Sequence, residues 1–182
     1  MKTVSRYHPL LVILHWLIGV LILAALALGL FGLALTPDTD PGKLDRLEIH
    51  MAGGMMILSL MAIRFVVRLT TAKPPKVASD RPGLDRLAAI VHYGFYLLVP
   101  AMVATGYATG ILAGLPAVVF QRTGAPLPPH LLTYPTQIAH GLLAILLTAL
   151  IVLHLAGALH RRRTNLLHRM ALGPRLAEPP AA

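Results

Sequence analysis

The 182-residue chain contains no cysteine, which excludes disulfide bonds, zinc–thiolate sites and cysteine-ligated iron–sulfur clusters. Charged residues are also scarce, at 13% of the chain, while apolar residues make up 56%. Soluble domains are about 25% charged and about 45–50% apolar. Together with a mean hydropathy of +0.71, this composition is typical of an integral membrane protein whose first partner is the lipid bilayer.

Acidic residues are few, and the formal net charge is +9. A nucleic-acid-binding protein would gather such charge on one face of a soluble domain. Here the basic residues lie between long apolar runs, where they orient helices in a membrane. We therefore expect no nucleic-acid partner.

Four apolar stretches reach the ~20 residues that a membrane-spanning helix needs. We predict an all-α membrane protein, an up-down four-helix bundle that forms one domain over residues 1–182. The first span is longer than the apolar region of a signal peptide and contains a histidine, so we interpret it as a retained anchor. Pro100 predicts a kink in the third span. The predicted spans are residues 9–35, 49–69, 87–112 and 138–160.

The basic residues predict the orientation of the bundle. Thirteen of the sixteen Lys and Arg residues precede the first span, surround the link between the second and third, or follow the fourth. Loops rich in Lys and Arg face the cytoplasm. Both termini are therefore predicted to be cytoplasmic.

Four histidines fall inside the spans at two heights. His15 and His154 lie a few residues from the cytoplasmic ends of the first and fourth spans, and His50 and His140 lie in the first turns of the second and fourth spans at the opposite face. The 14 residues from His140 to His154 cover about 21 Å and nearly four full turns, so both side chains leave the helix on almost the same side. We predict the pairs His15 with His154 and His50 with His140.

Two opposed imidazoles suit haem iron, to which the porphyrin already contributes four nitrogens. Zinc needs three or four protein ligands, which these pairs do not supply. Small residues that would leave room for a porphyrin follow each histidine by one turn, although small residues are also common in helix packing. The alternative is that the histidines are buried polar residues that form hydrogen bonds between helices. The small residues are Gly19, Gly54, Ala144 and Ala158.

Three further residues are candidates for binding the haem at the cytoplasmic side. Arg64 and Arg68 share one face of the second span, where they either clamp haem propionates or anchor the helix at the membrane surface. His92, near the cytoplasmic start of the third span, either forms a hydrogen bond with a propionate or anchors that helix.

These segments resemble the bacterial cytochrome b561 family over about residues 5–170. The resemblance implies a four-helix protein of the bacterial inner membrane with two haem b groups, whose axial ligands are His15, His154, His50 and His140 in the pairs given above. It also implies an electron carrier linked to the quinone pool, and one family member is proposed to oxidise superoxide while reducing ubiquinone. The matching segments are "SRYHPLLVILHWL", "IHMAGGMMILSLMAIRFVVRL", "HYGFYLLVPAMVATGY" and "AHGLLAILLTALIVLHLAGALHRR".

Two imidazoles on each iron leave no open coordination position, which favours outer-sphere electron transfer over oxygen chemistry at iron. We therefore expect a di-haem electron carrier that serves quinone, and leave open whether it is itself a quinone-linked oxidoreductase. One alternative is a haem b anchor subunit that relays electrons for a partner dehydrogenase or hydrogenase. Another is a non-redox transporter of metal ions that uses the same histidines.

Overall fold

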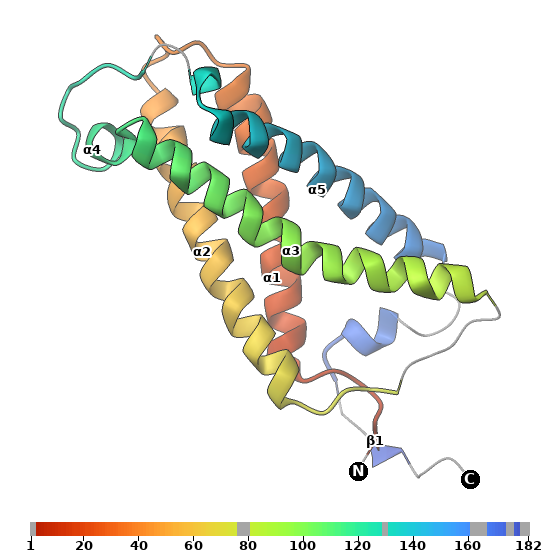
Figure 1. Cartoon of the computed structure of the whole chain (residues 1–182). Helices are drawn as coiled ribbons and strands as arrows, with labels where there is room; N and C mark the ends of the chain where they lie inside the picture. Colours follow the sequence, from red (N-terminus) through yellow and green to blue (C-terminus); the bar gives the residue numbers. More distant parts are fainter. Residues whose placement is uncertain (1–2, 76–80, 129–130, 161–166, 174–176, 179–182) are drawn as a thin grey trace.

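The computed structural model describes residues 3–75, 81–128, 131–160, 167–173 and 177–178. Four long helices cross the molecule, and each is long and apolar enough to span a membrane (Figure 1). The prediction of an all-α protein with four spans is therefore confirmed. The four helices are α1 (Pro9–Ala27, continued by the π-helix η1, Leu28–Ala34), α2 (Lys43–Thr70), α3 (Pro82–Leu112) and α5 (Pro135–His160).

Short elements lie at the two ends of the bundle. At one end the link from α3 to α5 contains α4 (Leu115–Val119) and η2 (Leu131–Thr133). At the other end η4 (Leu167–Met170) follows α5, and the two-residue strands β1 (Thr3–Val4) and β2 (Ala177–Glu178) pair antiparallel. The described ends of the chain thus meet at one end of the bundle, which we call the inner end, and the end with α4 is the outer end (Figure 1).

Proline and glycine mark the helix ends. Pro9 and Pro82 occupy the first turns of α1 and α3, where the missing N–H costs no hydrogen bond. Pro135 is the first residue of α5. After α3, Gly114 adopts the left-handed conformation with φ of 65°, which a residue without Cβ takes at little cost and which stops the helix.

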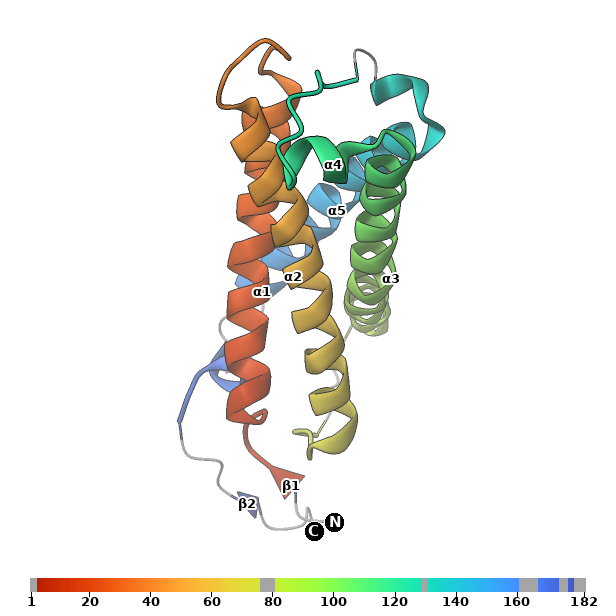
Figure 2. The same ribbon diagram turned by 90° about the vertical axis from the view of Figure 1, so that its left-hand side faces the viewer.

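The helices form two closely packed pairs, α1 with α2 and α3 with α5. Figure 2 shows α1 and α2 side by side, with α3 to one side and α5 behind. Contact between the pairs is made mainly by α2 and α3. Pro100 lies inside α3, which changes direction about midway along its length (Figure 1), as the sequence predicts.

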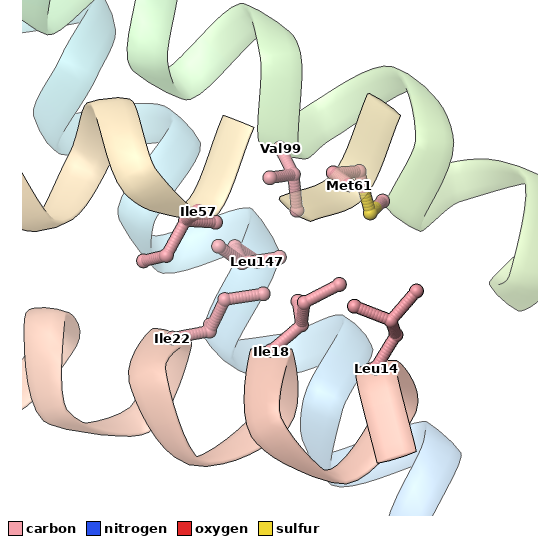
Figure 3. Packing of buried hydrophobic residues seen from close by; sticks show 7 residues of the cluster. All are labelled: Leu14, Ile18, Ile22, Ile57, Met61, Val99 and Leu147. Carbon is pink, nitrogen blue, oxygen red and sulfur yellow. The ribbon is translucent and has the colours of Figure 1, made fainter. Parts of the chain in front are cut away.

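The buried core is a layer of apolar side chains from all four long helices (Figure 3). Leu147 of α5 is 3% exposed and lies seven residues from both His140 and His154. Ile57 of α2 follows His50 by seven residues. The middle of the layer therefore lies between the two heights of the histidines, while Leu14, next to His15, extends it to one of them. Its members are Leu14, Ile18, Ile22, Ile57, Met61, Val99 and Leu147.

The inner end also carries the link between α2 and α3. Arg169 donates a hydrogen bond to the carbonyl oxygen of Pro75 in that link, at 2.6 Å. The described members of the three groups of basic residues used for orientation therefore lie toward one end of the bundle, while the cytoplasmic placement of that end stays a prediction. Six of these basic residues lie outside the described residues: Lys2, Lys76, Arg161, Arg162, Arg163 and Arg175.

We predict that Leu147→Ala lowers the stability of the bundle by about 2–5 kcal/mol, because truncating a fully buried leucine removes apolar contacts and leaves a cavity. Thermal unfolding of the purified protein in detergent measures the effect. The control is Leu146→Ala, because Leu146 is 55% exposed and faces away from the layer. Equal unfolding midpoints for the two variants would contradict the prediction.

Candidate functional site

The four histidines meet in two pairs. At the inner end, the ring centres of His15 from α1 and His154 from α5 are 6.0 Å apart. At the outer end, the ring centres of His50 from α2 and His140 from α5 are 6.1 Å apart. We call these pairs the inner tier and the outer tier, and they are the pairs that the sequence predicts.

Each tier joins helices whose backbones are not closely packed on one another. Among the described helices, α1 with α5 and α2 with α5 are absent from the pairs in extensive contact. The imidazoles therefore reach toward each other across the space between the two helix pairs. A flat group held between two rings needs this arrangement.

The separation of the rings fits two nitrogens on one metal ion. A metal–imidazole distance of about 2 Å on each side, with each ring centre about 1 Å further out, gives about 6 Å between the centres. Within the described ranges no group of three or more His, Cys, Asp or Glu residues could hold a metal ion. The donor set therefore suits an iron whose remaining ligands come from a porphyrin.

The hydrogen bonding of His140 supports a ligand role. Its Nδ1 lies 2.9 Å from the carbonyl oxygen of Met102 in α3, so Nδ1–H donates and the lone pair of Nε2 is left for a metal. The hydroxyl oxygen of Thr105 lies 3.3 Å from the same Nδ1. Across the tier, Nδ1 of His50 is buried and has no hydrogen-bond partner in the described part of the chain.

Glycines line both tiers in two different ways. A Cβ on Gly19 or Gly54, one turn after His15 and His50, would meet no protein atom within 4 Å. A Cβ on Gly29 of η1 would lie 3.2 Å from Cε1 of His50, and one on Gly106 of α3 would lie 2.9 Å from Cε1 of His140. The outer-tier imidazoles thus rest directly on backbone that carries no side chain.

Aromatic rings surround the inner tier. The ring centres of His92 and Phe95, both from α3, lie 5.3 and 5.4 Å from that of His154. Nδ1 of the exposed His92 also lies 2.5 Å from the carbonyl oxygen of Ala88, one turn earlier in the same helix. His92 is therefore at the height that the sequence predicts, beside a paired histidine.

Arg64 carries a positive charge into the bundle beside this tier. Its guanidinium donates to the hydroxyl of Tyr96 and lies 5.7 Å from the centre of that ring. Its Nε is buried without a hydrogen-bond partner among the described residues. Among the described residues, neither Arg64 nor the half-buried Arg68 forms an ion pair with a carboxylate.

The model of the prokaryotic cytochrome b561 family matches residues 6–173. The chain belongs to this family. It is also 30% identical over 120 residues to "Cytochrome b561 homolog 2" of Escherichia coli (strain K12), which covers 65% of this chain and 63% of that protein. It is 31% identical over 105 residues to "Probable superoxide oxidase CybB" of Yersinia pestis, which covers 57% of each chain. The chain thus aligns with about three-fifths of the length of these curated relatives.

Membership in the cytochrome b561 family implies a multi-pass membrane protein that binds haem b and takes part in electron transport. The resemblance noted from the sequence is therefore confirmed. The number of haems and the identity of their axial ligands stay predictions, as do the roles of Arg64, Arg68 and His92.

At the outer end of this cytochrome, one arginine ties the link after α4 to the start of α2. Arg122 donates to Asp45 at 2.8 Å and to Glu48. These hydrogen bonds, first that with Asp45 and then that with Glu48, raise the pKa of Arg122 above its ordinary value. The pairing neutralises charge two residues from His50, where the outer tier begins.

Several residues that position the tiers could not be recognised from sequence. The carbonyl of Met102 is a backbone group, and a backbone group has no residue signature. Gly106 and Gly29 look like the other glycines of membrane helices until the fold brings the imidazoles against them. Phe95 could have been found, because it lies three residues after His92 and so on the same face of α3.

Proposed function

We propose that this chain carries electrons across the bacterial inner membrane through two haem b groups, one held at each tier by a pair of histidines. The observation that supports this most strongly is the meeting of four imidazoles in two pairs, at 6.0 and 6.1 Å between ring centres. His15 and His154 would be the axial ligands at the inner tier, and His50 and His140 those at the outer tier.

Haem b supplies, when bound, an iron that takes up and releases single electrons. If two imidazoles hold each iron as proposed, no coordination position would remain for oxygen or another substrate. The apolar layer around Leu147 keeps water away from the path between the tiers. These residues therefore favour electron transfer without bond making at the metal.

Arg64 is proposed to hold a haem propionate at the inner tier, with Arg68 and His92 nearby. A half-buried guanidinium with no carboxylate partner in the described residues needs an anion, and a propionate carboxylate can accept two of its N–H groups. The buried Nε of Arg64, which has no hydrogen-bond partner among the described residues, supports this role.

The inner end is proposed to face the cytoplasm, because the loops richest in Lys and Arg belong to it. The electron partner in the membrane is proposed to be a quinone. The relative named "Probable superoxide oxidase CybB" suggests superoxide as a donor at the outer face, which would make the chain a superoxide:ubiquinone oxidoreductase.

The proposal predicts two haem b groups per chain. The pyridine haemochrome assay on the purified protein gives haem type and stoichiometry, and reduced-minus-oxidised spectra show whether the haems are low-spin with two nitrogen ligands. A preparation without a Soret band would refute the proposal and favour a metal-ion transporter. A protein subunit that co-purifies in fixed ratio would instead favour an anchor subunit.

Single replacements of the α5 histidines should each remove one haem. We predict that His140→Ala abolishes binding at the outer tier and His154→Ala at the inner tier, because each variant leaves one iron with a single imidazole. Haem content per chain should fall from two to one in each case. His160→Ala, an exposed position at the end of the same helix, should retain both. Loss of both haems from either α5 variant, with the helices still folded, would contradict independent tiers.

The inner-tier haem should have the higher reduction potential. The positive charge of Arg64 stabilises the more negative, reduced state of the nearer haem. A potentiometric titration checks this, with each haem assigned by its absence from the His140 or His154 variant. A higher potential at the outer tier would contradict the prediction.

A further inference from the structure

The outer tier is fixed to α3 by a contact that needs no side chain. Nδ1–H of His140 donates to the carbonyl oxygen of Met102, at 2.9 Å. Gly106 follows Met102 by one helical turn, so the two residues lie on the same face of α3. The imidazole of His140 lies over this face.

Only glycine leaves room for the ring at position 106. A Cβ there would lie 2.9 Å from Cε1 and 3.1 Å from Nδ1 of His140. Carbon atoms that are not bonded attract each other at about 3.5–4.0 Å and repel at shorter distances. A side chain at this position would push the ring off α3 and lengthen the hydrogen bond to Met102.

We propose that Gly106 is a positioning residue that sets the reduction potential of the outer-tier haem. It lets His140 keep the hydrogen bond to Met102, and this bond fixes the orientation of the ring and makes its other nitrogen a more basic ligand. A more basic ligand stabilises the oxidised iron and lowers the potential. The inference rests on the proposed ligation of haem by His50 and His140.

A role in helix packing alone makes a different prediction. Gly94 also lies on α3 against α5, where a Cβ would be 3.0 Å from Cδ2 of Leu150 and would touch no histidine. Gly94→Ala therefore disturbs the same helix interface without reaching His140. It is the matched control for Gly106→Ala.

The test is a redox titration of the purified protein with its haems bound, together with the low-spin electron paramagnetic resonance signal of each haem. Gly106→Ala should raise the midpoint potential of the outer-tier haem and shift its low-spin signal, or release that haem alone. The inner-tier haem should be unchanged. Gly94→Ala should leave the outer-tier haem as in the unaltered protein.

Two results would overturn the inference. One is an outer-tier haem with unchanged potential and signal in Gly106→Ala, and the other is an equal change in Gly94→Ala. A preparation without haem would refute the proposed function itself, whereas two haems with an insensitive outer tier would refute only the role of Gly106.

A measurement on the unaltered protein covers the case in which Gly106→Ala does not fold. Pulsed electron paramagnetic resonance after exchange into deuterated water detects the N–H of each axial imidazole. The outer-tier signal should contain an N–H with the coupling of a strong hydrogen bond. An outer-tier signal that lacks such an N–H coupling would also overturn the inference.

Discussion

The arrangement of the chain depends on one requirement, that imidazoles from three helices meet in two pairs. Helix α5 gives one histidine to each tier, and His140 and His154 can both face inward because 14 residues are close to four turns. The partners come from α1 and α2, which pack on each other and not closely on α5. Two helix pairs that are held apart, with one pair of facing histidines between them at each height, satisfy this requirement.

The features that sequence alone could predict are those set by hydropathy and helical period. Apolar runs of sufficient length located all four helices. Most predicted ends lie within about three residues of the observed ends, but α2 begins six residues and α3 five residues before the predicted span. The depth of each histidine in its run indicated which two share a height, and the structure brings those pairs together. The ligand role of the four histidines stays a prediction, which the family membership makes specific.

Features that arise from backbone and close approach could not be predicted. The last seven residues of the first span form the π-helix η1, which places Gly29 against His50, and no residue type encodes that winding. The carbonyl of Met102 and the contact at Gly106 depend on how α3 and α5 cross. The contact of Trp16 with the carbonyl oxygen of Met170, 3.0 Å away, joins segments 154 residues apart.

The apolar layer has a consequence for energy conversion. Its seven described side chains carry no hydroxyl, carboxyl or imidazole, and the hydroxyl of Tyr96, which packs against the layer, accepts a hydrogen bond from Arg64. On the proposed path between the tiers, an electron that crosses this layer would do work against, or be driven by, the voltage across the bilayer, at about 2.3 kcal/mol per elementary charge for each 100 mV. Electron transfer between the two faces would therefore be electrogenic. The voltage across the membrane would then help to set its direction, together with the chemistry of donor and acceptor.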